Sequence, residues 1–205
     1  PLRVTVAPRP STRPIRGAAQ DDSAAGSEAS GWGVDLFASL EEALAAVAPN
    51  GKVLVEPGEY LAPAQGWFID KNVTITGGQD TPPLNPDPQA PPERQPEPNP
   101  QAPPSPEAVL LGEVIIAGED ATTVTISGLT ILAPTGGAAI RIAAANADVC
   151  LLENCLGGDQ TAVLVEDFAS LSLSGNVLSG GQGVSAPDGF DIPPAWREHN
   201  EFLAP

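Results

Sequence analysis

A repeat of short, alternating, strand-like segments constrains the fold of this chain more than any other feature. The segments TVTISGLTIL (123–132), DVCLLENCLG (148–157) and SLSLSGNVLS (170–179) align at steps of 25 and 22 residues. Their apolar residues fall into three columns: Val124, Val149 and Leu171; Ile126, Leu151 and Leu173; Ile131, Leu156 and Leu178. A period of this length, built from short alternating segments, is typical of a chain wound as a solenoid of strands.

Further segments extend the repeat. NVTITGG places Val73 and Ile75 in the first two columns, and a second series runs through VIIAG (from 114), AIRIA (from 139), AVLVE (from 162) and GVSA (from 183). We therefore predict an all-β fold, a short parallel β-helix of about four coils, with the right-handed sense that strand twist imposes on parallel crossovers. Asn154 and Asn176 share a column at a bend, where Asn tolerates a left-handed backbone and its amide can ladder between coils.

One helix is predicted before the coils. The run LFASLEEALAAVA (36–48) places Leu36, Leu40, Leu44 and Val47 at helical spacing, and Pro49-Asn50-Gly51 follows as a stop signal. Ser39 precedes two glutamates and is the expected N-cap. We expect this helix to cap the N-terminal end of the solenoid.

The chain divides into five predicted segments. They are an extended basic, low-complexity arm (1–33), the cap helix with the first coil (34–78), a Pro-rich inserted loop (79–106), the β-helix coils (107–186) and a C-terminal cover (187–205). The loop holds 12 of the 24 prolines, so it cannot join a sheet; a stiff spacer and a PxxP ligand for an SH3-like partner are both open interpretations. The cover is expected to pack Phe190, Ile192, Trp196 and Phe202 on the last coil.

The order of these elements resembles a known superfamily. The stretches SLEEALAAVAPNGKVLVEPGEY, KNVTITGG and TVTISGLTIL, followed by the coils with an Asn bend, are similar to right-handed β-helix proteins of the pectate-lyase-like superfamily. The similarity covers roughly residues 36 to 186 and implies that the N-terminal helix plugs the open end of the solenoid. It does not imply one activity, because this superfamily includes lyases, hydrolases, esterases, tailspikes and surface proteins.

Charge limits the partners. Nine Lys and Arg face 26 Asp and Glu, and the net charge of -17 repels nucleic acid and anionic lipid, so neither is an expected partner. No segment approaches the roughly 18 apolar residues needed to span a bilayer, so membrane insertion is not expected. The basic residues are unevenly placed: Arg3, Arg9, Arg13 and Arg16 give residues 1–16 a charge of +4, which leaves 5 - 26 = -21 for the rest.

The coils lack the residues that catalysis on this fold would need. Within residues 107–185, Arg141 is the only basic residue against nine acids, and its register points it outward as a solvated strand arginine. The lone histidine, His199, lies outside the repeat and is expected in the C-terminal cover. Cys150 and Cys155 flank a bend and are expected to be free thiols. No catalytic residue is therefore assigned, and catalysis is not the expected role.

Acidic residues recur at one turn of the repeat: Glu119, Asp120, Asp148, Glu166 and Asp167. Stacked coils would bring such carboxylates within about 4.8 Å of one another, and calcium prefers several carboxylate oxygens. Calcium is therefore the one cofactor that these residues allow. Ordinary solvated turn acids are the competing interpretation, because the dense calcium-loop spacing is absent.

The favoured function is a non-catalytic structural or assembly protein whose ends and arm contact other subunits in a homo-oligomer or filament. Leu2, Val4 and Val6 alternate as a half-buried strand would, and Arg3 and Arg9 lie beside them. We expect this arm to add a strand to a neighbouring subunit. The alternative is a module that binds or acts on polysaccharide. Pro1 and the absence of Met favour a processed chain at an extracellular or cell-surface location.

Overall fold

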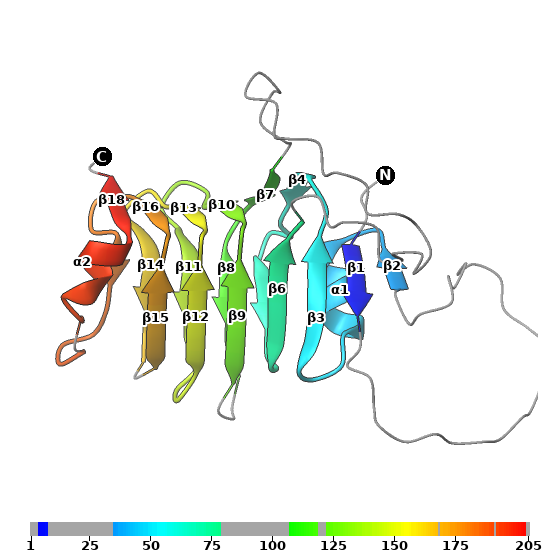
Figure 1. The fold of residues 1–205 in the computed structure, drawn as a ribbon, viewed down its shortest axis with the longest axis horizontal. Coiled ribbons are helices and arrows are strands. Elements are labelled where there is room, and N and C mark those ends of the chain that lie inside the picture. Colours follow the sequence, from blue (N-terminus) through cyan, green and yellow to red (C-terminus); the bar gives the residue numbers. More distant parts are fainter. Residues whose placement is uncertain are drawn as a thin grey trace, which may run out of the picture.

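The computed structural model describes residues 4–7, 35–78, 107–118, 122–167, 169–190 and 192–203. In this part of the chain, short parallel strands stack into a β-solenoid of about five coils (Figure 1). Each coil contributes one strand to each of three sheets, called here sheets A, B and C. The prediction of an all-β parallel β-helix with one N-terminal helix is confirmed.

The three sheets follow the repeat of the sequence. Sheet A contains β3 (Gly51–Val55), β6 (Val73–Gly77), β9 (Thr123–Ser127), β12 (Asp148–Leu152) and β15 (Ser170–Ser174). Sheet B contains β4 (Gly58–Leu61), β7 (Ala108–Leu111), β10 (Thr130–Leu132), β13 (Cys155–Gly157) and β16 (Val177–Ser179). Sheet C contains β5 (Trp67–Ile69), β8 (Val114–Ile116), β11 (Ala138–Ile142), β14 (Thr161–Val165) and β17 (Val184–Ser185).

The coil count is about five rather than four because of the proline-rich insertion. Residues 78–107 separate Gly77 from Ala108, yet β6 pairs with β9 in sheet A while β7 and β8 pair with β10 and β11 in sheets B and C. The strands on either side of the insertion therefore complete one coil. The sequence repeat contains β6 and β8, but the insertion separates them, so the pattern does not show that they belong to one coil.

The predicted columns form the core. Val124, Val149 and Leu171 are cross-strand partners, and so are Ile126, Leu151 and Leu173 in the same sheet and Ile131, Leu156 and Leu178 in sheet B. All nine side chains are buried. Val73 and Ile75 continue the first two columns as predicted. Because strand side chains alternate between two faces, this register sends the intervening polar residues outward.

An asparagine ladder lines the corner between sheets A and B. Asn154 Nδ2 donates to Ile126 O (2.9 Å) and to Asn176 Oδ1 (3.1 Å), and Asn176 Nδ2 donates to Leu151 O (2.8 Å) and Asn200 Oδ1 (2.9 Å). Asn154 and Asn176 are 2% and 1% exposed, so these bonds satisfy amides that are cut off from water. The predicted ladder is confirmed, and Asn200 adds a third rung beyond the repeat.

Helix α1 (Leu40–Ala46) closes the N-terminal end with its buried residues Leu40, Ala43 and Leu44 (Figure 1). Ser39 is the N-cap as predicted: its Oγ accepts from the Glu42 backbone N–H at 3.2 Å, while the Glu42 carboxylate accepts from Ala38 N. The helix is shorter than the predicted 36–48, because residues 35–37 form strand β2 (Asp35–Phe37) instead.

Strand β1 (Val4–Ala7) lies between β2 and β3 and is antiparallel to both. It therefore extends sheet A beyond the first coil, and the described part of the predicted arm pairs within its own chain. The sequence predicted instead that the arm adds this strand to a neighbouring subunit.

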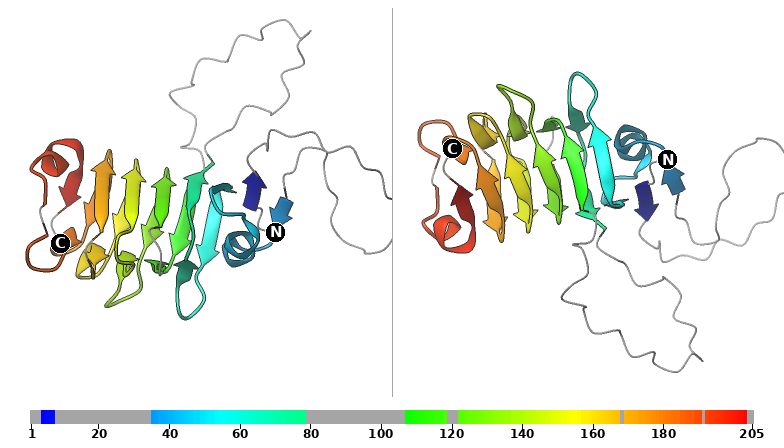
Figure 2. Two further views of the ribbon diagram at one scale, coloured as in Figure 1. Left: turned by 90° about the horizontal axis from the view of Figure 1, so that it is seen from below. Right: turned by 90° about the horizontal axis from the view of Figure 1, so that it is seen from above.

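The C-terminal end is covered by helix α2 (Ala195–His199) and strand β18 (Glu201–Leu203), at the opposite end from α1 (Figure 2). Trp196 is buried, and its ring centroid lies 6.3 Å from that of Phe190. Ile192 and Phe202, also expected in the cover, stay exposed. Neither helix in the described part of the chain has the length and apolar character to cross a bilayer.

Candidate functional site

Two grooves gather all the exposed large apolar side chains of the described residues. Leu61, Phe68 and Leu132 line a lateral groove where sheets B and C meet, and Ile192, Phe202 and Leu203 line a groove at the C-terminal end. Scattered exposed leucines on a soluble protein need no explanation, but exposed apolar residues that converge on a concave surface mark contact sites. These grooves are the candidate functional surfaces.

The lateral groove has a volume of about 740 Å³ and is built by the first three coils. Leu61, Leu111 and Leu132 are partners in sheet B, and Phe68, Ile115 and Arg141 are partners in sheet C. All six take outward positions on their strands. The parallel register therefore turns two outward columns into the two walls of the groove.

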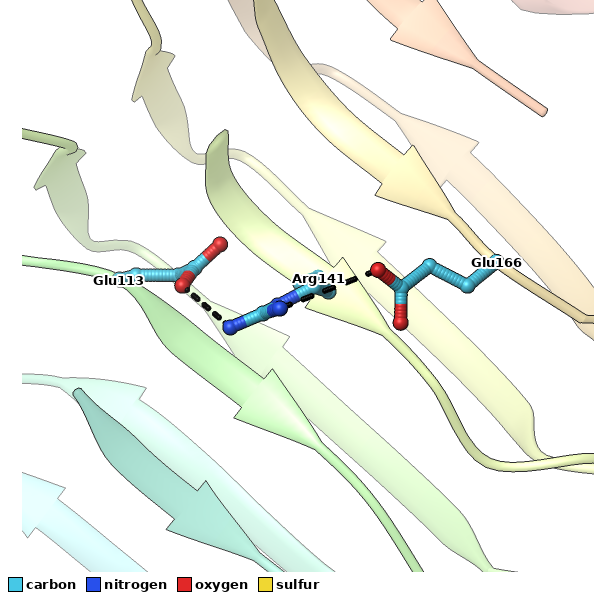
Figure 3. A network of polar contacts seen from close by, with 3 residues as sticks. All are labelled: Glu113, Arg141 and Glu166. Atoms are coloured by element: carbon cyan, nitrogen blue, oxygen red, sulfur yellow. Dashed lines mark hydrogen bonds and ion pairs between the residues drawn. The ribbon is translucent and has the colours of Figure 1, made fainter. Parts of the chain in front are cut away.

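Arg141 supplies the positive charge in this groove and is held between two glutamates (Figure 3). Its Nη2 lies 2.9 Å from Glu113 Oε2, just before β8, and its Nη1 lies 3.8 Å from Glu166 Oε1, just after β14. The Arg141 Nε is buried and has no hydrogen-bond partner. Arg141 is therefore a paired arginine rather than the solvated one expected from the sequence.

The guanidinium of Arg141 carries several N–H donors in a planar fork, which suits carboxylate and hydroxyl groups. It can orient an anionic or hydroxyl group of a ligand, and Phe68, which is half exposed, gives an apolar surface beside it. The two glutamates leave the cluster with a net charge of -1, which opposes a strongly anionic ligand.

The C-terminal groove has a volume of about 570 Å³ and lies between the last coil and the cover. Gly183 (φ 66°) makes room for one of its walls, because a Cβ at this position would lie 2.6 Å from the Phe202 ring. Strand β18 is the last strand of sheet B and has β16 as its neighbour on one side. Its other edge faces away from the solenoid, so apolar side chains and a strand edge occur together at this end.

Three of the five acidic residues predicted for calcium, Asp148, Glu166 and Asp167, lie in the described part of the chain. Asp148 lies between Thr123 and Ser170 in sheet A, while Glu166 is paired with Arg141 and Asp167 is exposed next to it in the chain. In the described ranges, no three His, Cys, Asp or Glu side chains form a group that could hold a metal ion. Glu119 and Asp120 lie outside the described residues. The side chains of Asp148 and Glu166 therefore do not form the stack that the sequence allowed.

The remaining candidate residues are His199, Cys150 and Cys155. His199 is exposed, and its Nδ1 lies 2.9 Å from the Ala195 carbonyl oxygen of the same helix. Cys150 and Cys155 are free, half-buried thiols, as expected. Burial, and then the charge of Glu107, raise the pKa of the Cys155 thiol, so that its neutral form dominates at physiological pH. A nucleophile needs the opposite shift.

The assembly residues predicted in the arm are only partly described. The backbone of Val4 and Val6 belongs to β1, whereas Leu2, Arg3 and Arg9 lie outside the described residues.

Comparison with protein-family models, with curated proteins and with solved structures finds no match for this chain.

The lateral groove was not predicted from the sequence. Within residues 107–185 the only aromatic residue is Phe168, whereas Phe68 comes from the first coil, and Leu61 and Leu132 belong to different coils. A usable signal was present: Leu61 and Phe68 are apolar residues at the outward positions of strands β4 and β5, where the alternating pattern calls for polar residues.

Proposed function

We propose that this chain is a non-catalytic structural protein that associates with other subunits through the ends of its solenoid. The observation that carries the proposal is the clustering of Ile192, Phe202 and Leu203 on the C-terminal end, beside the outer edge of β18. Apolar side chains next to a strand edge provide both area and backbone hydrogen bonds for a partner. A contact between unlike ends propagates into a chain of subunits, and a contact between like ends closes a dimer.

Sedimentation velocity over a range of protein concentrations tests this proposal. We expect the sedimentation coefficient to rise with protein concentration. Phe202→Ser should raise the concentration at the midpoint of association at least about tenfold, which is equivalent to about 1.4 kcal/mol of association free energy. Leu61→Ser is the matched control, because Leu61 is 81% exposed but lines the lateral groove. A chain that stays monomeric at every concentration contradicts the proposal. If Leu61→Ser weakens association and Phe202→Ser does not, the contact lies at the lateral groove and the proposal is wrong.

The same proposal includes kinship with the pectate-lyase-like superfamily and a location outside the cell or at its surface. The support for kinship is the cap helix, the three-sheet coil and the asparagine ladder, taken together. A structural role suits a solenoid, because each coil contacts only its neighbours and the two ends are where further subunits can be added.

Polysaccharide binding is the second candidate, and the lateral groove favours it. Phe68 offers a face for a sugar ring, and Arg141 offers hydrogen-bond donors beside it. The -1 charge of the Glu113–Arg141–Glu166 cluster favours a neutral glycan over pectate or alginate. Calorimetric titration with neutral and anionic oligosaccharides, with and without calcium, distinguishes these ligands. Phe68→Ala should remove any binding that the groove provides.

A further inference from the structure

Strand β18 leaves the C-terminal edge of sheet B open. It is the last strand of that sheet, and among the described residues only β16 pairs with it. Glu201 N–H donates to Asn176 O at 2.8 Å, on the side that faces β16. Because successive residues of a strand direct their backbone groups to opposite sides, the N–H and C=O of Phe202 face the open edge. Unpaired groups of this kind are a template for pairing with a strand of another chain.

The side chains at this edge are apolar and incompletely buried. Phe202 continues the inward column of sheet B next to Leu178, which is fully buried, yet Phe202 is 39% exposed. Leu203 beside it is 43% exposed, and Ile192 lines the same end of the molecule. The described part of the chain has no coil beyond β18. The core column therefore ends on an aromatic ring that one more strand would cover.

A second copy cannot supply that strand by continuing the solenoid. Such a copy would place its β4 parallel to β18, in the register of sheet B. Strands β1 and β2 extend sheet A by two positions beyond β3, whereas β18 extends sheet B by one position beyond β16 (Figure 1). The β2 strand of the second copy would therefore occupy the place of β15. Glu59 and Glu201 also share one outward column of sheet B, so the continued register would set these two carboxylates opposite each other.

We infer that two copies join through their β18 strands about a two-fold axis, and that the two strands run antiparallel. This inference rests on the proposed function and names its partner, a second copy, and the end at which that copy binds. The axis passes beside Phe202, whose N–H and C=O bond to the C=O and N–H of the same residue in the second copy. Glu201 then lies opposite Leu203 rather than opposite another glutamate. The charge conflict of the parallel register is avoided.

The two-fold contact also covers the exposed apolar side chains. Directly opposed, hydrogen-bonded residues of antiparallel strands have Cα atoms about 5.5 Å apart, so the two Phe202 rings lie side by side on the inner face of the joined sheet. The C-terminal groove of each copy faces the other copy, and its volume of about 570 Å³ gives room for apolar side chains of the partner. Each copy has one such end, so the contact closes a dimer and does not propagate.

The register provides a direct test. One full-length chain carries Glu201→Cys and a second carries Leu203→Cys, both with Cys150→Ser and Cys155→Ser. All three residues of β18 are exposed, so substitutions at its two ends leave the core intact. In the two-fold arrangement, residues 201 and 203 form a non-hydrogen-bonded pair with Cα atoms about 4.5 Å apart, which a disulfide can bridge. Their side chains lie on the same, outward face of sheet B.

The two chains are mixed at high dilution, concentrated to where the wild type associates, and then oxidised. We expect at least about tenfold more covalent dimer from the mixture than from either chain alone, because each chain alone sets its cysteine opposite a residue without a thiol. Glu59→Cys mixed with Glu201→Cys, in the same background, is the matched control, since these two positions meet only in the parallel contact of unlike ends.

The outcomes separate this inference from the proposed function. Covalent dimer from the Glu201→Cys and Leu203→Cys mixture, above both single chains, supports the two-fold contact. If the control pair is cross-linked instead, the two-fold contact is overturned and the proposed function stands. If neither pair is cross-linked although the wild type associates and Phe202→Ser weakens that association, the ends meet in another geometry, and again only this inference is overturned. If the wild type stays monomeric at every concentration, both are overturned.

Discussion

At the scale of single residues, Asn176 shows how this solenoid handles polar groups in its interior. Its side chain is 1% exposed, accepts from the Asn154 backbone N–H at 3.0 Å and donates to Leu151 O at 2.8 Å. These bonds join consecutive coils at a corner where strand pairing is interrupted. An apolar residue of similar size would fill the space and leave the backbone groups unpaired.

We expect Asn176→Ala to lower the free energy of unfolding by about 2–3 kcal/mol, because it leaves buried donors and acceptors without partners and opens a small cavity. Urea denaturation followed by circular dichroism measures this change. Ser172→Ala on the neighbouring strand is the control and should change stability by less than about 0.5 kcal/mol. If Asn176→Ala also changes the free energy of unfolding by less than about 0.5 kcal/mol, the ladder does not contribute to stability.

Cys155 provides a prediction that depends on pH. Burial raises the pKa of its thiol first, and the charge of Glu107 adds to this, so the thiolate forms only at higher pH than in the unfolded chain. In a Cys150→Ser background, the rate of alkylation by iodoacetamide should rise with pH and reach its midpoint above that of the urea-unfolded protein. Glu107→Gln removes the second cause and should move the midpoint down, whereas Glu41→Gln on α1 should not. A folded midpoint equal to the unfolded one would contradict the prediction.

At the scale of elements, the corners between sheets A and B explain why the sequence predicts about four coils and the structure has about five. Four of these corners contain two residues each: 56–57, 128–129, 153–154 and 175–176. The fifth contains residues 78–107, yet its ends are held like the others: Gly78 N donates to Val55 O, and Glu107 O accepts from Gly58 N. Val55 and Gly58 flank a two-residue corner, so the ends of the insertion lie close together.

Deleting residues 81–104 should therefore preserve the fold. It leaves residues 78–80 and 105–107 to connect β6 with β7, and the equivalent corners are shorter still. We expect an unchanged β-sheet circular dichroism spectrum and a melting temperature within about 2 °C of the full chain. Deleting residues 134–136, which belong to the described corner between β10 and β11, is the contrasting variant and should lower the melting temperature. Loss of the β-sheet signal in the first deletion would make the insertion part of the folded core.

The same scale explains what the sequence could and could not predict. Burial of one strand face imposes a period of two, so columns such as Val124, Val149 and Leu171 can be recognised without coordinates. Three-residue strands such as β2 and β18 carry no period, and their pairing depends on which edges remain open after the coils have formed. The lateral groove could not be predicted from the alternating pattern, because Leu61 and Leu132 belong to different repeats and lie together only once the coils are stacked.

At the scale of the whole molecule, the distribution of charge governs association. The body of each copy carries -21 and repels other copies, and the compensating +4 is concentrated in residues 1–16. Apolar contact at the C-terminal end has to overcome this repulsion, whereas contact between the arm and an acidic neighbour reduces it. Salt distinguishes the two contributions, since it screens arginine–carboxylate contacts but leaves apolar contact in place.

Removing residues 1–16 tests this balance. It also removes β1 and leaves β3 without its outer neighbour, so we expect a folded chain with a lower melting temperature, measured by circular dichroism. By sedimentation velocity, its association should be at least about tenfold weaker at low salt. Between about 50 and 500 mM salt, the association of the full chain should fall while that of the truncated chain does not. Replacing Arg3, Arg9, Arg13 and Arg16 by Gln is the matched control: it keeps β1 and should reproduce the loss of salt dependence without the lower melting temperature. If the truncated chain associates as strongly as the full chain and with the same response to salt, the arm takes no part in assembly, and the contact must come from the apolar C-terminal end alone.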